Sequence, residues 1–155
     1  MKKTNTARVS ALESHLGFWL RFVSNQVSSR FESLLAEHDI SVTEWVAMRS
    51  LYGHMDATHA ELISALGMTK GAASKVISKL EAKGFAERKL SKDSQREQVL
   101  SLTDTGNKLV PKLATIADEN DSLFFGHLTD LQRQSLMALM KELVLHHQLK
   151  QVPTR

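Results

Sequence analysis

The amino-acid sequence predicts a mainly α-helical (α+β) protein with one small β-hairpin near its middle. Apolar residues recur at spacings of three and four over most of the chain, which is typical of amphipathic helices. Several of these segments open with Ser or Thr followed three residues later by Glu or Gln, the capping-box signature of a helix start. Residues 85–90 and 97–102 differ, because they are short and have the composition and alternation of strands.

The first predicted helix runs from about Leu12 to Leu35 and is about six turns long. Phe18 and Phe22 form a second apolar line beside its main apolar stripe. Two apolar stripes indicate two packing partners, which we interpret as the helix's own domain and a second copy of the chain. The alternative is one wide core-facing surface in a monomer.

Two short helices are predicted next, and the first of them should stop near Gly53 and His54. Ser41 and Glu44 form a capping box before one helix, and Thr58 and Glu61 form another before a short helix that stops at Gly67. Thr69 is then the expected N-cap of a third, basic helix. A short helix, a glycine-containing turn and a basic helix predict a helix-turn-helix.

The basic helix has two different faces. Ala73, Val76, Ile77 and Leu80 share one face at helical spacing and can be buried. The opposite face is small, hydroxylated and cationic, with no carboxylate before Glu81, as close contact with a polyanion requires. The alternative is an ordinary surface helix whose lysines only solvate it. The residues of the polar face are Lys70, Gly71, Ser74, Lys75 and Ser78.

The segment after the basic helix strengthens the nucleic-acid interpretation. Gly84 ends the helix, and two predicted strands, residues 85–90 and 97–102, enclose a polar loop. Such a hairpin can place Lys92, Ser94 and Arg96 on the DNA backbone or in the minor groove while the helix occupies the major groove.

Charge is concentrated in the same region. Residues 69–96 contain eight lysines and arginines and three acidic residues, a net charge of +5, whereas the whole chain carries only +3. A basic block of this kind is the electrostatic footprint expected of nucleic-acid contact.

Two further helices are predicted after the hairpin, opened by Thr103 and by a third capping box at Thr129 and Gln132. Pro111 lies inside the first of them and should bend it. Together with the first helix they carry more apolar surface than the central unit can cover, so burial in a two-fold dimer is expected.

Other classes of protein have less support in the sequence. Absence of a long apolar run and of a signal-peptide pattern predicts a cytoplasmic protein without a membrane partner. Zero cysteines exclude disulfides, thiolate metal sites and thiol redox sensing. No phosphate loop or nucleophile motif indicates an enzyme. The seven histidines show no metal-binding spacing, although a site assembled in space stays an alternative. No metal and no cofactor are expected.

Nearly the whole chain resembles the MarR family of winged helix-turn-helix transcriptional regulators. The resemblance lies in the first helix with Trp19 and Phe22, in residues 58–68, in residues 74–88, and in the wing and following turn at residues 96–106. The wing reads Asp93-Ser94-Gln95-Arg96 where the family has Asp-x-Arg, and Lys75 stands where many members have Arg. The corresponding division is a DNA-binding lobe at residues 41–103 and dimerisation helices at residues 10–38 and 104–150, within a single MarR-like chain of residues 1–155.

The resemblance implies a homodimer that binds a pseudo-palindromic double-stranded DNA operator, usually as a repressor, and that is often released by a small aromatic or phenolic anion. For such an effector, His15, Trp19, Trp45 and Arg49 are the expected lining; the alternative is that both tryptophans belong to the core. Competing hypotheses are a helical dimerisation or adaptor protein without DNA affinity and a metal-responsive regulator. The residues expected to contact DNA are Thr69, Lys70, Gly71, Ser74, Lys75, Ser78, Lys79, Arg88, Lys92, Ser94 and Arg96.

Overall fold

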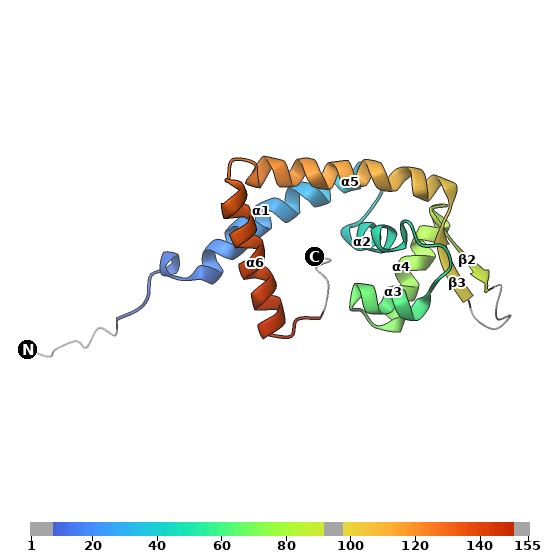
Figure 1. Cartoon of the computed structure of the whole chain (residues 1–155), viewed down its shortest axis with the longest axis horizontal. Coiled ribbons are helices and arrows are strands. Elements are labelled where there is room, and N and C mark those ends of the chain that lie inside the picture. The colour runs from blue at the N-terminus through green and yellow to red at the C-terminus, as the bar shows by residue number, and fades with distance from the viewer. Residues whose placement is uncertain (1–7, 92–97, 151–155) are drawn as a thin grey trace, which may run out of the picture.

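The structure is a computed structural model that describes residues 8–91 and 98–150. Helices α1 and α5 lie side by side along one edge of the molecule, and a lobe of short helices and strands lies beneath one end of this pair (Figure 1). The elements are a 3-10 turn η1 (Leu12–Ser14), α1 (Leu16–Ala36), α2 (Val42–Leu51), β1 (Ala57–Thr58), α3 (His59–Leu66), α4 (Lys70–Ala82), β2 (Ala86–Leu90), β3 (Gln98–Leu102), α5 (Asp104–Phe125) and α6 (Asp130–His146).

The helix starts confirm the predicted caps. In three caps, a side-chain hydroxyl accepts a hydrogen bond from the backbone amide three residues later, and the Glu or Gln side chain at that later position accepts one from the backbone amide of the cap residue. These caps are Ser41, Thr58 and Thr129. Thr69 and Thr103 accept the amides of the third residue of α4 and α5. Because each such cap is worth about 1 kcal/mol, the local sequence fixes where these helices begin.

The end of α4 is also as predicted. Gly84 has a φ of +78°, and its amide bonds to the carbonyl of Glu81 while the Phe85 amide bonds to that of Leu80. This pair of bonds is the Schellman motif. It stops the helix and turns the chain directly into the hairpin.

The predicted first helix is divided in the structure. Its start at Leu12 was wrong by one turn, because η1 is a separate 3-10 turn and His15 is extended, with φ −98° and ψ 126°. The indole N–H of Trp19 donates to the carbonyl of Glu13 at 2.9 Å, and the Ser14 hydroxyl donates to the carbonyl of Ala11. These side chains take carbonyls that a continuous helix needs for its backbone amides.

The strands form an antiparallel sheet in the order β1-β3-β2. Ala86 pairs with Leu102 and Leu90 pairs with Gln98, which confirms the predicted hairpin. Strand β1 was not predicted, since its two residues have no alternation and become a strand only by pairing with Val99 and Leu100. The sheet fixes the hairpin against the end of the helix-turn-helix.

One buried core joins these elements and extends beyond residues 41–103. Leu35 of α1 and Val110 and Leu113 of α5 are as buried as the centre of the lobe, at 0–1% exposure. The long helices are further joined by Asn120, which is buried, accepts a bond from Arg30 at 2.8 Å and donates one to the Val27 carbonyl. The lobe is therefore rigidly connected to α1 and α5.

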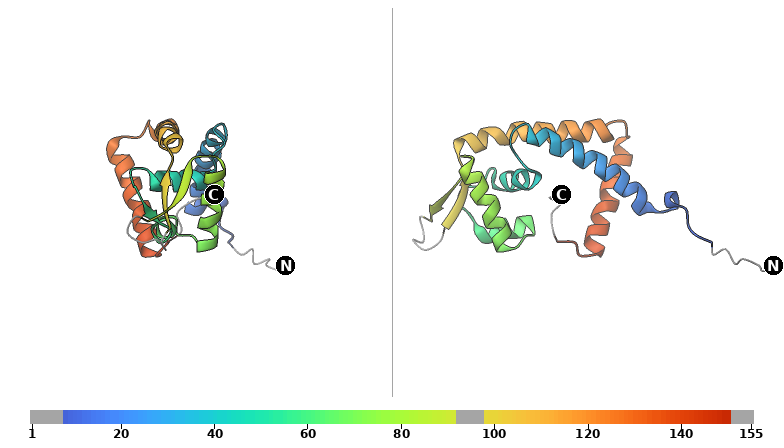
Figure 2. Two further views of the ribbon diagram at one scale, coloured as in Figure 1. Left: turned by 90° about the vertical axis from the view of Figure 1, so that its right-hand side faces the viewer. Right: turned by 180° about the vertical axis from the view of Figure 1, so that it is seen from behind.

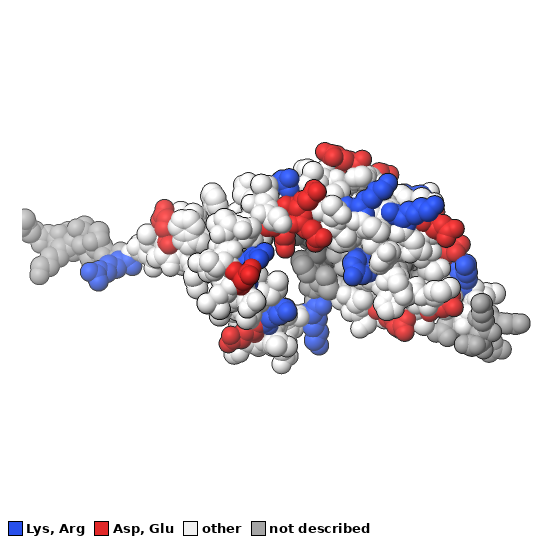
Figure 3. Space-filling view, turned by 45° about the horizontal axis from the view of Figure 1, so that its top comes forward, with Lys and Arg blue, Asp and Glu red and all other residues white. Residues whose placement is uncertain are grey.

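Helix α6 and the start of α1 project from this core. Figure 2 shows α6 turning away from the end of α5 and standing apart from the lobe, and none of its residues is buried. In Figure 3 the surface along the N-terminal part of α1 is largely uncharged. The exposed apolar residues of these segments include Leu12, Leu16, Trp19, Leu20, Phe22 and Val23 before the core, and Leu131, Met137, Leu139, Leu143, Val144 and Leu145 on α6.

Candidate nucleic-acid interface

Helix α4 has the two faces that its sequence predicts. Ala73, Val76, Ile77 and Leu80 are at most 8% exposed and belong to the core. Gly71 lies on the other side, and a Cβ added there would meet nothing within 4 Å. The polar side is therefore an open surface on a helix that is held firmly from behind. The predicted residues brought together on it are Thr69, Lys70, Gly71, Ser74, Lys75, Ser78 and Lys79, of which only Ser74 is partly buried.

Arg88 on β2 has a different role from the one expected of a free cation. Its Nη2 donates to the Ser78 hydroxyl at 3.0 Å and to the Ser74 carbonyl at 3.4 Å, and its Nε lies 2.7 Å from a Glu81 carboxylate oxygen. The guanidinium thus ties the hairpin to α4, and Glu81 offsets part of its charge. Sequence reasoning missed this role because it depends on how β2 packs against α4.

The C-terminal end of α4 is anchored on α2. Lys83 Nζ lies 2.8 Å from one oxygen of Glu44, donates to the other at 3.1 Å, and donates to the Asp39 carbonyl. Glu44 is only 5% exposed and also serves the capping box of α2. Burial raises the pKa of this carboxyl, but the bonds from Lys83 and Ser41 outweigh it and hold the pKa below its usual value.

The predicted wing residues Lys92, Ser94 and Arg96 lie outside the described residues. The strands that lead to them are described as far as Leu90 and Gln98, which pair with each other. Their contribution to a DNA contact stays a prediction.

Two hollows flank α4 and add residues that sequence reasoning missed. One, of about 340 Å³, lies where Ser41 and Thr43 at the start of α2 meet Lys75 and Lys79. The other, of about 480 Å³, lies between the starts of α3 and α4 and the hairpin, and includes His59. The N-cap positions of α2 and α3 were a usable signal, since helix starts present amide donors to anions.

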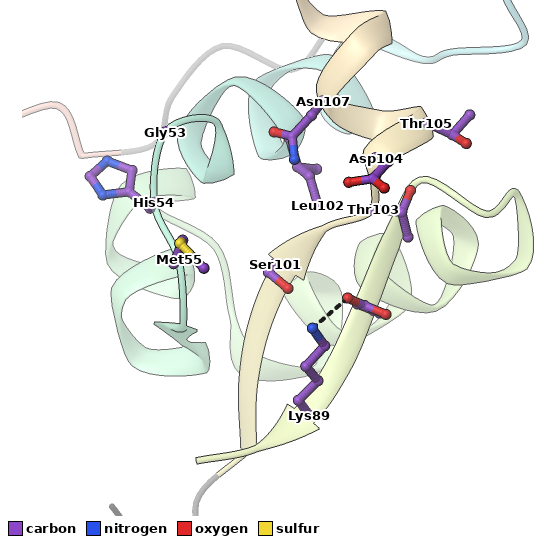
Figure 4. Close-up of a pocket in the computed structure, with 11 residues that line it drawn as sticks. Gly53, His54, Met55, Lys89, Ser101, Leu102, Thr103, Asp104, Thr105 and Asn107 are labelled. Atoms are coloured by element: carbon purple, nitrogen blue, oxygen red, sulfur yellow. Dashed lines mark ion pairs between the residues drawn. The ribbon is translucent and has the colours of Figure 1, made fainter. Parts of the chain in front are cut away.

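A further hollow lies on the opposite side of the hairpin (Figure 4). It has a volume of about 830 Å³, and the ion pair between Lys89 and Glu87, 2.8 Å long, lies at one side of it. None of the four residues expected to bind an effector lines it. Its lining is Gly53, His54, Met55, Glu87, Lys89, Ser101, Leu102, Thr103, Asp104, Thr105 and Asn107.

The expected effector residues do not converge within one chain. Trp45 packs edge-on against Phe31, and Arg49 lies over the ring of Tyr52. Trp19 is half exposed and precedes Phe31 by twelve residues of α1, which is about 18 Å at the helical rise of about 1.5 Å per residue. His15 lies beyond Trp19, with its ring nitrogen 3.2 Å from the Leu12 carbonyl. Trp45 and Arg49 are thus separated from His15 and Trp19.

The described part of the chain offers neither a metal cluster nor a membrane-spanning helix. Residues 8–91 and 98–150 contain no group of three or more His, Cys, Asp or Glu side chains that could hold a metal ion. Within the same ranges, no helix has the length and apolar character needed to cross a membrane.

Comparison with known proteins agrees with this geometry. Residues 40–98 match the model of the MarR family. This match identifies residues 40–98 as a MarR-family domain. MarR-family proteins are DNA-binding transcriptional regulators rather than enzymes, and this chain is such a regulator.

Relatives of this chain match over most of its length. It is 26% identical over 110 residues to the HTH-type transcriptional regulator SarZ of Staphylococcus haemolyticus, covering 71% of this chain and 75% of SarZ. Its fold is that of MepR from S. aureus, solved in complex with DNA, with a TM-score of 0.76 at 22% identity and coverage of 85% and 98%. CouR from Rhodococcus jostii, solved with p-coumaroyl-CoA, has a TM-score of 0.76 at 16% identity, covering 87% and 95%.

Proposed function

We propose that this regulator acts in the cytoplasm as a homodimeric repressor that places the polar face of α4 in the major groove of a pseudo-palindromic operator. The observation that carries the proposal is that face itself. It is small, hydroxylated and cationic, it is exposed, and a fully buried apolar face holds it in place. Hydroxyls and amines at this spacing can bond both phosphates and base edges.

We assign the DNA contacts to the seven residues from Thr69 to Lys79 named above, and to Lys92, Ser94 and Arg96 of the wing. Arg88 is assigned to the same DNA-facing surface, and it also holds α4 against the hairpin. The DNA-binding lobe is assigned to residues 41–103, with the shared core at Leu35, Val110 and Leu113 connecting it to the dimerisation helices of residues 10–38 and 104–150.

Dimerisation is supported by the unpartnered apolar surfaces of α1 and α6. Leu16 is 88% exposed and Leu143 is 52% exposed, and both belong to continuous apolar stripes. A monomer rarely leaves stripes of this size in water, whereas a two-fold axis would cover both at once. Two recognition helices roughly 34–36 Å apart would then enter successive major grooves.

A small aromatic anion is the proposed effector class, and the complex of CouR with p-coumaroyl-CoA supports it. Since His15 and Trp19 are separated from Trp45 and Arg49 within one chain, a site using all four would take them from two protomers. An effector lowers DNA affinity only by as much as it prefers the non-binding arrangement of the lobes.

Selection of bound sequences from a pool of random duplexes tests the proposal. A two-fold symmetric sequence, bound by two chains per duplex in light scattering, is the expected result. In vitro transcription from a promoter that carries this sequence should decrease when the protein is added. An adaptor without DNA affinity would select no sequence, and Lys75→Glu would not change its behaviour.

The effector arm of the test uses the chain's two tryptophans. Aromatic carboxylates are titrated against Trp19→Phe and Trp45→Phe variants, in which the remaining indole reports binding. An effector at the proposed site quenches both variants and releases the selected duplex. A compound that releases DNA but quenches neither variant binds elsewhere.

A further inference from the structure

The hollow beside the start of α4 has the chemistry of an anion site. Its lining brings together the cations Lys70 and Arg88, the Ser74 hydroxyl and the His59 imidazole, and it contains no carboxylate. Glu81 lies outside the lining but pairs with Arg88, so the hollow has a moderate positive charge. Two cations, a hydroxyl and an imidazole provide the donors that a phosphodiester oxygen accepts.

The position of the hollow identifies the source of that phosphate. It lies between the first turn of α4 and Gln98. Gln98 is the first residue of β3 and the described residue of that strand nearest to the wing. If α4 occupies the major groove and the wing approaches the adjacent minor groove, one DNA strand must pass between them, since a sugar-phosphate strand separates the two grooves. That strand would run across the hollow.

His59 is the titratable group of the hollow. It is the first residue of α3 and is partly buried. Burial lowers its pKa, Arg88 and Lys70 lower it further, and Glu81 opposes them. The imidazole is therefore neutral near about pH 7 when no anion is present.

The groups that face His59 come from each neighbouring element. Lys70 and Glu81 face it from α4 and Arg88 from β2, while Gln98 of β3 is uncharged. On α3 itself, the Glu61 carboxylate accepts the Thr58 amide at 2.9 Å in the capping box. A phosphate would add a negative charge to a site where cations currently oppose protonation.

We propose that this hollow binds a phosphate of the DNA backbone and that His59 takes up a proton when the phosphate enters, so that DNA affinity increases as the pH falls. The inference rests on the proposed function, because it assumes that the polar face of α4 contacts DNA. It adds His59 to the interface and makes operator binding sensitive to pH.

Proton linkage fixes the size of the effect. Uptake of one proton per protomer changes the association constant by at most about tenfold per pH unit, and by at most about a hundredfold for a dimer. The change is confined to the interval between the pKa of His59 in the free protein and its higher pKa in the complex. Above this interval the imidazole is neutral in both states, and below it the imidazole is charged in both.

The test measures binding of the selected duplex from about pH 8 to about pH 5.5 at constant ionic strength, by fluorescence anisotropy. The wild-type chain should bind more tightly as the pH falls, and His59→Gln, whose amide is neutral at every pH, should lose most of this dependence. The matched control is His127→Gln, since His127 is exposed in the turn between α5 and α6, and it should keep the dependence. A wild-type slope that persists in His59→Gln overturns the proposal.

A second measurement uses the wild-type chain and does not depend on how the variant folds. Histidine ring signals in NMR give the pKa of His59 in the free protein, with the duplex, and with inorganic phosphate at equal ionic strength. The proposal requires the duplex to raise the pKa of His59. An unchanged pKa with the duplex, whether or not free phosphate raises it, overturns the proposal. Absence of DNA binding at every pH would instead refute the proposed function.

Discussion

Replacing Lys83 by methionine tests how α4 is held in position. The ammonium of Lys83 lies 2.8 Å from the Glu44 carboxylate and also bonds to the Asp39 carbonyl. Methionine keeps most of the length and apolar stem of the side chain but removes the charge. Glu44, which is 5% exposed, would then be a buried carboxylate without its cation.

Breaking a buried ion pair on one side costs about 3–5 kcal/mol when both groups are fully desolvated. The Lys83 side chain is 25% exposed, so water reaches the pair and the cost is smaller. We expect the free energy of unfolding to fall by about 2–3 kcal/mol, which lowers Tm by about 4–12 °C for a chain of this size.

The dependence on pH follows from the direction of the Glu44 pKa. In the wild-type protein this pKa is lowered by its partners, so the contribution to stability is present at neutral pH and is lost as the pH falls through the folded-state pKa. In Lys83→Met the burial remains without the ammonium, which raises the pKa and favours the protonated carboxyl. The difference between the two proteins should therefore shrink as the pH falls from the variant's higher pKa to the wild-type pKa, which lies below the ordinary value of 4.5.

Guanidinium unfolding at a fixed protomer concentration, near pH 7 and near pH 3.5, measures both effects. The control is Lys79→Met on the exposed side of the same helix, which should change stability by less than about 0.5 kcal/mol. Adding Glu44→Gln to Lys83→Met should recover part of the loss, because no buried charge remains. The reasoning is refuted if Lys83→Met is no more destabilising than Lys79→Met, or if its effect is equal at both pH values.

Three further substitutions test the proposed DNA interface and the proposed dimer. Gly71→Ala should raise the stability of α4 by up to about 1 kcal/mol, because the added methyl meets no protein atom. It should weaken DNA binding if the DNA backbone approaches this point. Unchanged affinity in fluorescence anisotropy would remove Gly71 from the interface. If Lys75 reads base edges, Lys75→Ala should cost about 1–3 kcal/mol of binding free energy on the selected sequence and less on random DNA. Equal losses of affinity on both DNAs would assign Lys75 to phosphate contacts. Leu143→Glu should give monomers or aggregates in light scattering, because it places a charge in an exposed apolar stripe; an intact dimer would move the interface away from α6.

Local signals in the sequence were sufficient to predict most of the fold. Thr69 and Thr103 were predicted as caps because their hydroxyls bond to amides only a few residues away, and such contacts do not depend on distant parts of the chain. The same holds for the glycine turn at Gly84. Strand β1 escaped prediction for the opposite reason, since its two residues form a strand only beside β3.

The candidate site was predicted in part. The exposed side of α4 follows from helical periodicity, so Lys75 and Ser78 are where the sequence places them. The contact of Arg88 with Ser78 and the position of His59 beside Lys70 depend on how the hairpin packs on α4, which periodicity does not contain. Trp19 and Trp45 were grouped by their chemistry, and the structure separates them.

The most direct test of the central claim is the salt dependence of DNA binding by the wild-type protein and by Lys75→Glu. If α4 and the wing neutralise DNA phosphates, the logarithm of the association constant should fall linearly with the logarithm of salt concentration, by about 0.9 per phosphate contacted. Lys75→Glu should bind the selected duplex far more weakly at low salt. A flat salt response by the wild-type protein, or equal affinities of the two proteins, would contradict the account.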